Sequence, residues 1–198
     1  MTKRIWIAAA ILIALPVAGM ASGQAGKAGT KNPIVVLDTA MGIVRIEVFV
    51  DKAPITAKNF LDYVNAGFYD GTIFNRIIPN FVVQAGGYTQ DMVQKPMRPP
   101  IKNEASNGLK NVRGALSMAH YTDPNSATSH FFINLNANTS LDPHPGEVGF
   151  AVFGKVIEGM EVVDKIGKVK TATRTVQGTP FEYVPVQPVS LKSAKLQK

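Results

Sequence analysis

Apolar and polar residues alternate along the first strongly patterned part of the chain, residues 34–50. Between residues 43 and 48, Arg45 and Glu47 occupy one set of alternate positions, and the other set is entirely apolar. A period of two is typical of a β-strand with one buried face and one solvated face. Small residues around Gly42 interrupt the pattern, so the stretch predicts two strands joined by a turn.

A helical pattern follows these strands. Pro54 stands where the first turn of a helix should begin. Gly67 lies just beyond the last turn, where a left-handed residue often ends a helix. Between them, apolar residues follow the i, i+3, i+4, i+7 spacing of one helix face: Ala57, Phe60, Leu61 and Val64.

The rest of the chain alternates between short apolar stretches and turn-forming residues. Residues 74–87 predict two strands joined at Ile78-Pro79-Asn80, and residues 160–167 predict a second short helix that ends at Gly167. Residues 91–109 predict a long irregular connection. Single strands are predicted at residues 112–119, 129–135, 149–159 and 185–196. About eight short strands with two separate helices favour a closed antiparallel barrel or a sandwich.

The first residues have the layout of a secretory signal peptide. Lys3 and Arg4 precede an uncharged apolar run over residues 5–15, which Pro16 ends. A membrane span needs roughly 20 residues, so this run predicts a cleaved signal rather than an anchor. We expect cleavage after Ala21, which makes residues 1–21 the signal, 22–33 a flexible leader, and 34–198 the domain.

Composition limits the function of the exported chain. The sequence contains no cysteine, so it forms no disulfide and carries no lipoprotein anchor, and its stability must come from core packing. A bacterial periplasm fits this composition best. The formal net charge is +7, but the basic residues are scattered rather than arranged in a stripe with aromatic residues. We therefore expect no nucleic-acid partner, no membrane association after cleavage, and a monomer.

Two polar residues stand out in the otherwise apolar stretch FNRIIPNFVVQAGG. Arg76 and Gln84 lie in the two strands predicted there. An unpartnered guanidinium is very unfavourable in a dry core. The pattern alone leaves two interpretations: both residues face outward on an edge strand, or both serve a site.

Serine, histidine and aspartate residues raise the alternatives of a hydrolase site or a metal site. Serine, histidine and aspartate occur close together in the sequence, but no G-x-S-x-G motif is present, so a catalytic triad is disfavoured. The three histidines do not have the spacing of metal ligands. The residues concerned are Ser126, Ser129, His120, His130, His144 and Asp142.

Four stretches, in this order, resemble the cyclophilins, a family of peptidyl-prolyl cis-trans isomerases. They are FNRIIPNFVVQAGG, GALSMAHYTDPNSATSHFFINL, SLD and FAVFGKVIEGMEVVDKI, and the resemblance runs from about residue 34 to residue 191. It is closest to the periplasmic cyclophilins of Gram-negative bacteria. The resemblance implies a mainly β fold, a closed eight-stranded antiparallel barrel capped by two α-helices, with no cofactor and no metal. It also implies that proline-containing, unfolded or partly folded polypeptides are the partners.

The same resemblance implies a set of site residues. Arg76 matches the arginine that hydrogen-bonds the prolyl peptide, and Gln84 matches the glutamine that helps to hold it. The remaining matches are substrate-binding positions around a proline pocket and its groove: Phe81, Val82, Ala119, His120, His130, Phe132, Leu141 and Phe150.

The chain departs from the usual family pattern at two of these positions and at Ser140, next to a third. Ser140 stands where a tryptophan usually precedes the leucine, Phe150 stands where a histidine is common, and His130 replaces a glutamine. Because that tryptophan is associated with cyclosporin binding, we expect weak binding of cyclosporin. We expect His130 to make a polar contact in the groove without acid–base chemistry. A proline-peptide-binding chaperone module with little catalysis is the alternative function.

Overall fold

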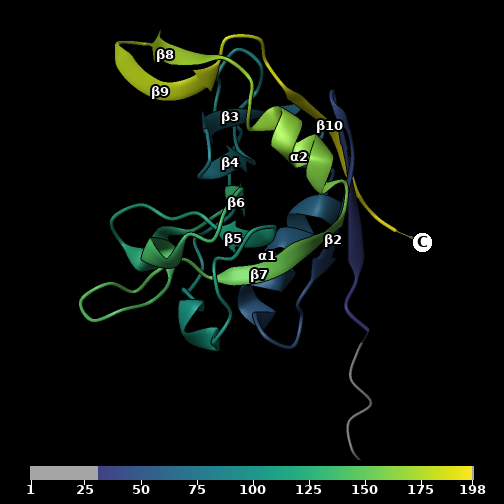
Figure 1. Ribbon diagram of the computed structural model, residues 1–198, viewed down its shortest axis with the longest axis vertical. Coiled ribbons are helices and arrows are strands. Elements are labelled where there is room, and N and C mark those ends of the chain that lie inside the picture. The colour runs from purple at the N-terminus through teal and green to yellow at the C-terminus, as the bar shows by residue number, and fades with distance from the viewer. Residues whose placement is uncertain (1–30, 198) are drawn as a thin grey trace, which may run out of the picture.

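The computed structural model describes residues 31–197 as a closed barrel of eight antiparallel strands with two helices and one additional hairpin (Figure 1). The predicted barrel with two helices is confirmed. The barrel strands are β1 (Ile34–Thr39), β2 (Gly42–Val48), β3 (Thr72–Ile78), β4 (Val82–Ala85), β5 (Ala115–Met118), β6 (Phe131–Asn134), β7 (Val152–Glu158) and β10 (Ser190–Leu196). Around the barrel, their order is β1-β10-β3-β4-β6-β5-β7-β2.

The two helices, α1 (Pro54–Asn65) and α2 (Met160–Ile166), each bury one face in the same hydrophobic core. Phe60 of α1 has its ring 5.2–5.4 Å from the rings of Tyr69, Phe131 and Phe153. Aromatic pairs at this separation add to the free energy gained from apolar burial. Gly67 follows α1 with φ +62°, as the sequence predicts.

The long connection between β4 and β5 is tied to the start of α1. Ala53 occupies the N-cap position of this helix and has no side chain that can accept a hydrogen bond there. The carboxylate of Glu104 accepts the backbone N–H groups of Ile55 (3.1 Å) and Thr56 (2.8 Å) instead. Free N–H groups at a helix N-terminus favour an anionic acceptor, so this contact both completes the helix and holds the connection.

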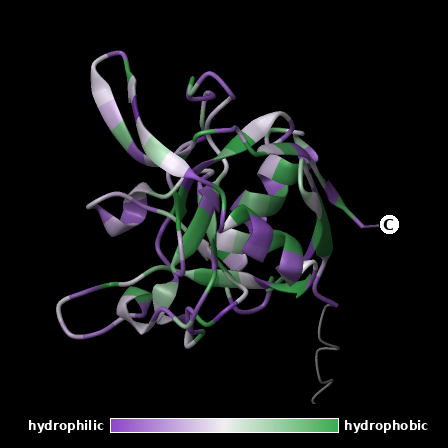
Figure 2. Ribbon diagram, turned by 45° about the horizontal axis from the view of Figure 1, so that its top comes forward, coloured by the Kyte–Doolittle hydropathy of each residue, from purple (hydrophilic) through white to green (hydrophobic). Residues whose placement is uncertain are grey.

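A two-stranded sheet lies outside the barrel and was missed by the sequence analysis. It consists of β8 (Thr171–Val176) and β9 (Thr179–Pro185), which project from the barrel in Figure 2. Gln177 and Gly178 connect the strands with φ of +50° and +81°. Two positive φ values match the tight hairpin turn whose twist suits antiparallel strands. Most residues of β8 are exposed, so no apolar alternation marks this strand in the sequence.

The part of the sequence predicted to be a signal peptide lies outside the described residues. At the end of the predicted leader, the Pro33 carbonyl accepts the Val48 N–H at 2.9 Å, and Asn32 donates to Glu47 at 2.9 Å. Residues 32 and 33 are therefore held against β2. Within residues 31–197, neither helix is long and apolar enough to cross a bilayer.

Candidate active site

One row of side chains crosses four neighbouring strands on the outer face of the barrel. Arg76 of β3 pairs with Gln84 of β4, and Gln84 pairs in turn with Phe132 of β6. Phe132 then pairs with Ser117 of β5. The residues next to this row, such as Val83 and Ile133, point into the core and are fully buried. Because side chains alternate between the two faces of a strand, the row faces away from the core.

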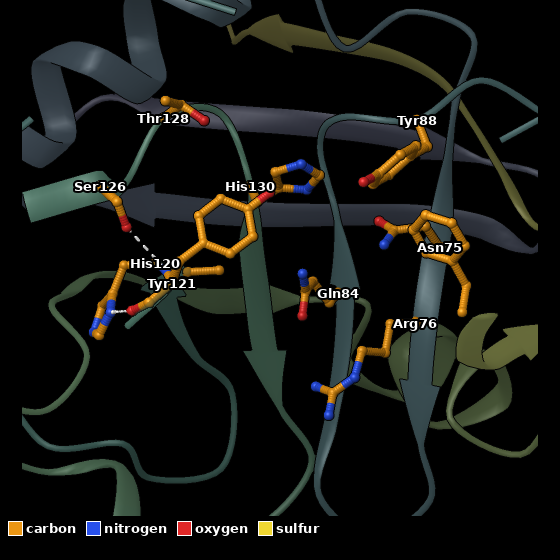
Figure 3. A pocket seen from close by; sticks show the side chains of 11 residues that line it. Asn75, Arg76, Gln84, Tyr88, His120, Tyr121, Ser126, Thr128 and His130 are labelled. Atoms are coloured by element: carbon orange, nitrogen blue, oxygen red, sulfur yellow. Dashed lines mark hydrogen bonds between the residues drawn. The ribbon is translucent and has the colours of Figure 1, made fainter. Parts of the chain in front are cut away.

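A β-bulge in β3 gives Arg76 this outward direction. Phe74 pairs with Ala85 and Arg76 pairs with Gln84, so Asn75 is an extra residue on β3. Regular alternation would place Phe74 and Arg76 on the same face. The extra residue reverses the parity, as bulges beside active sites often do. Phe74 is therefore fully buried in the core, while Arg76 is half-buried and reaches from β3 across β4 beside Gln84 (Figure 3).

Most of the predicted site residues surround one cavity of about 400 Å³. All of them except His130 line it, and Tyr121 joins them. The residues around the cavity are Arg76, Phe81, Val82, Gln84, Ala119, His120, Tyr121, Phe132, Leu141 and Phe150. The structure thus brings together positions that are up to 74 residues apart in the sequence, from Arg76 to Phe150. Their chemical roles remain predictions.

Aromatic rings form a rigid wall of this cavity. The rings of Phe132 and Phe150 meet edge to face with centroids 5.6 Å apart. The ring of His120 stacks on that of Phe150, with centroids 4.3 Å apart and 17° between the ring planes. Nδ1 of His120 lies 2.6 Å from the carbonyl oxygen of Tyr121, and Nε2 lies 3.2 Å from the carbonyl oxygen of Gly149. His120 therefore supports the wall formed by Phe150.

The guanidinium group of Arg76 lies at the edge of this apolar cavity. No carboxylate of residues 31–197 forms an ion pair with it. The guanidinium carbon lies over the ring of Tyr183, 5.9 Å from the ring centroid. Arginine carries five N–H donors in a rigid plane, and here these donors are available to a ligand.

A buried polar network lies behind the cavity and holds its walls. Asn111 donates to the carbonyl oxygen of Leu141 at 3.1 Å and to the carboxylate of Asp142 at 3.0 Å. Asn138 donates to the Phe81 carbonyl oxygen at 2.9 Å and to Asn134 at 2.8 Å. Leu141 and Phe81 both line the cavity. Fully bonded buried polar groups rigidify the segments that they join, so this network fixes the spacing of the two walls.

His130 lies in a second, smaller cavity of about 190 Å³ that adjoins the first and shares Arg76 and Gln84 with it. Its ring lies near the backbone of Ala85, but neither nitrogen makes a hydrogen bond of normal geometry. Burial lowers the pKa of His130 to about 4. The ring is therefore neutral at neutral pH and cannot act as a charged acid there.

The glycine pair after β4 makes room for this imidazole. A Cβ atom at Gly87 would lie 2.1 Å from Cε1 of His130. A Cβ atom at Gly86 would lie 2.5 Å from the Ser129 carbonyl oxygen, and Gly86 has φ +107°. Neither position can accept a side chain without displacing its neighbours. The pair therefore allows close packing of β4 against the segment that carries His130.

The residues considered for a catalytic triad do not assemble. The Ser129 hydroxyl is buried without a hydrogen-bond partner. The Ser126 hydroxyl binds the backbone of Tyr121 and Asp123, and Asp142 faces Asn111. No Ser–His–Asp triad forms among residues 31–197. In the same range, no group of three or more His, Cys, Asp or Glu side chains is arranged to hold a metal ion.

Several residues that line the cavities are not predicted by the sequence pattern. Tyr121 lines both of them, and Asn75, Tyr88 and Phe181 line the smaller one. Tyr121 directly follows His120, and an exposed tyrosine beside a predicted groove was a usable signal. Phe181 belongs to the hairpin that was not predicted, and Asn75 is the bulge residue, so the alternation pattern could not indicate either one.

Comparison with known proteins gives the same family throughout. The family model described as cyclophilin type peptidyl-prolyl cis-trans isomerase/CLD matches residues 34–196. The chain is 46% identical to peptidyl-prolyl cis-trans isomerase A of Dickeya dadantii over 198 residues, which is 100% of both chains. It is 47% identical to peptidyl-prolyl cis-trans isomerase B of Escherichia coli over 163 residues, which is 80% of this chain and 99% of the relative.

A solved structure with a similar fold is a cyclophilin type peptidyl-prolyl cis-trans isomerase of Cryptosporidium parvum. Its TM-score is 0.69 at 25% identity, and the match covers 84% of this chain and 98% of that one. A second crystal structure of the Cryptosporidium parvum protein, obtained in the presence of the dipeptide Ala-Pro, gives a TM-score of 0.68. Sequence and fold agree, and the chain belongs to the cyclophilin-type peptidyl-prolyl cis-trans isomerases.

Proposed function

We propose that this enzyme accelerates cis–trans isomerisation of X–Pro bonds in exported proteins and that Arg76 carries the catalysis. The observation that supports this role most directly is the position of Arg76. Its guanidinium has no carboxylate partner among the described residues and borders a cavity walled by Phe132, Phe150 and other apolar side chains. A positive charge held beside an apolar hollow suits a ligand that is apolar at one end and accepts hydrogen bonds at the other.

The chemistry of the prolyl bond explains why such a charge is useful. Rotation about a peptide bond has a barrier of about 18–20 kcal/mol, because the nitrogen lone pair is conjugated with the carbonyl group. For X–Pro bonds, uncatalysed exchange takes tens to hundreds of seconds. At the twisted transition state, the nitrogen is pyramidal and its lone pair can accept a hydrogen bond. In the planar ground state, that lone pair is delocalised.

Arg76 is suited to bind the twisted state more tightly than the planar one. Only interactions that are stronger in the transition state than in the ground state accelerate the step. A thousandfold acceleration requires about 4 kcal/mol, and a charged hydrogen bond in a site that excludes water supplies a large part of this free energy. The step needs no nucleophile and no proton transfer, because no covalent bond is broken.

The other site residues position the substrate. The proline ring would enter the cavity between Phe132, Leu141 and Phe81, which exclude water from the bond. Gln84 lies opposite Arg76 and would hold the peptide and the guanidinium in register. Proline-containing, unfolded or partly folded polypeptides are the proposed partners, and we expect weak cyclosporin binding because Ser140 replaces the family tryptophan.

The proposed location is the periplasm. The N-terminal pattern of a signal peptide supports it, and the relative from Dickeya dadantii matches the whole chain, so it carries a corresponding N-terminal segment. Mass spectrometry of the protein from the periplasmic fraction should give a mature chain that begins at Ser22. A protein that retains Met1 in the cytoplasmic fraction would contradict export.

Exchange on a proline peptide tests the activity and separates it from the alternative, a module that only binds. At one protein per hundred peptides, the enzyme should broaden the separate cis and trans NMR signals of an Ala-Pro peptide by speeding their exchange. A module that only binds would shift the signals at high protein concentration without accelerating exchange. The second result would overturn the proposed activity.

A further inference from the structure

The β8–β9 hairpin carries a β-bulge beside the active site. Ala172 pairs with Val184, and Arg174 pairs with Phe181. One residue of β8 therefore opposes two residues of β9, which are Glu182 and Tyr183. Tyr183 has φ +59°, in the left-handed region that bulky residues rarely adopt. Bulges with such residues are common beside active sites, where they change the direction of a side chain.

The direction that the bulge gives Tyr183 is toward Arg76. The guanidinium carbon lies over the tyrosine ring, 5.9 Å from its centroid. Such a cation is attracted by the ring's negative face at separations up to about 6 Å. Tyr183 is 41% exposed. Packing of its ring in the core therefore does not explain the unusual backbone conformation.

The hairpin is fixed to the strand that carries Arg76. Val184 is buried with Ile73 of β3 and Met92 in a second small hydrophobic cluster. Arg174 donates to the carbonyl oxygen of Gln90 at 3.2 Å. Phe181 meets Tyr88 edge to face with centroids 5.7 Å apart. The position of Tyr183 relative to β3 is therefore set by packing on both sides of the bulge.

We propose that Tyr183 is a positioning residue that orients the guanidinium of Arg76 for catalysis. The inference rests on the proposed role of Arg76. A long arginine side chain without an ion-pair partner would sample several rotamers. A carboxylate would restrict it, but would also occupy its N–H donors and neutralise its charge. An aromatic face restricts the cation and leaves the donors in the guanidinium plane free for the substrate.

Two substitutions separate the ring from the backbone. Tyr183→Phe keeps the aromatic face, and it should retain the wild-type rate. Tyr183→Gly removes the ring and suits the positive φ, so the hairpin should fold at least as well. We expect the glycine variant to lose kcat by roughly two- to five-fold, the range for an exposed cation–π contact, while KM changes little. Glu182→Ala, at the other bulge position, is the matched control and should leave the rate unchanged.

A double-mutant cycle shows whether Tyr183 acts through Arg76. In an Arg76→Ala background, Tyr183→Gly should cause no further loss of rate, because the group that the ring orients is absent. The NMR signal of the Arg76 Nε–H group should also shift in Tyr183→Gly and stay in place in Tyr183→Phe. Full activity of Tyr183→Gly, or an equal loss in the Arg76→Ala background, would overturn the inference. A wild-type rate for Arg76→Ala alone would instead overturn the proposed role of Arg76.

Discussion

Arg76 and Gln84 stand directly opposite each other in the β3–β4 ladder, and both line the same two cavities. Side chains at directly opposed positions of an antiparallel pair have Cβ atoms about 4.5–5.5 Å apart. The amide of Gln84 is therefore the polar group best placed to hold a peptide against the guanidinium. The contribution of this pair can be tested without altering the barrel.

Gln84→Leu should lower kcat/KM for an Ala-Pro peptide by roughly tenfold, because the amide that aligns the peptide is lost while Arg76 remains. Exchange measured by NMR at low protein concentration gives the rate. Gln94→Leu is the matched control, since Gln94 is exposed and does not line either cavity. If both variants kept the wild-type rate, Gln84 would have no part in catalysis.

Asn111→Ala should destabilise the fold by about 1–3 kcal/mol, because the buried Ser117 hydroxyl donates to the Asn111 side chain and would lose this acceptor. It should also raise KM, since Leu141 loses a bond that holds the cavity wall. Urea unfolding and peptide kinetics measure the two effects. Asn136→Ala is the control, because exposed Asn136 makes one side-chain bond, to the Asn80 carbonyl oxygen. A lower stability with an unchanged KM would limit the network to a structural role.

The stability of the protein should depend on pH through His130. Its pKa is about 4 in the folded protein and about 6.5 in an unfolded chain, so the unfolded state binds more protons between these values. Stability should therefore fall as the pH decreases from about 6.5 to 4. The free energy of unfolding should decrease from pH 7 to pH 4.5 in both proteins, and the decrease should be about 2–3 kcal/mol smaller in His130→Gln than in the wild type.

Urea unfolding of both proteins at the two pH values checks this prediction, and the difference between them removes the effects of other acidic groups. Those groups include Glu47 and Asp164. A hydrogen bond from Asn32 lowers the pKa of Glu47, and one from Arg113 lowers the pKa of Asp164. Equal losses in wild type and His130→Gln would mean that the imidazole accepts a proton in the folded protein as readily as in the unfolded chain.

Ser140→Trp should tighten cyclosporin binding by at least tenfold. Ser140 is exposed in the short turn Thr139–Leu141, next to a residue that lines the cavity, so an indole there would extend the apolar wall. Titration calorimetry measures the affinity. Thr139→Trp places the same ring one residue earlier in the turn, not next to Leu141. This variant should bind the drug no better than the wild type. Equal affinities of Ser140→Trp and wild type would show that other departures weaken binding.

Apolar periodicity and short apolar stretches predicted the barrel strands and both helices, because each helix buries one face and strands such as β5 and β6 are buried on both faces. It could not predict the direction of Arg76. Strict alternation would have turned this residue into the core with Phe74, and the bulge at Asn75 that prevents this has no signature in the pattern. The placement of Arg76 in a groove came from the family resemblance.

The hairpin shows a second limit of pattern reasoning. Most of its residues are exposed, and what buries Val184 is a contact with Ile73 and Met92, far away in the sequence. The contribution of Phe181 to the smaller cavity depends on this long-range packing. For His130, the sequence suggested a polar contact in the groove, whereas the structure buries both of its nitrogens.

The most direct test of the central claim is the exchange rate of a saturating Ala-Pro peptide on wild type, Arg76→Ala and Arg76→Lys. We expect Arg76→Ala to lower the rate at saturation by roughly 10²–10³-fold, as loss of a donor aimed at developing charge does elsewhere, while Kd changes by less than about fivefold. Arg76→Lys should recover only part of the rate, because it restores the charge without the planar fork. An unchanged rate at saturation in Arg76→Ala would contradict the account.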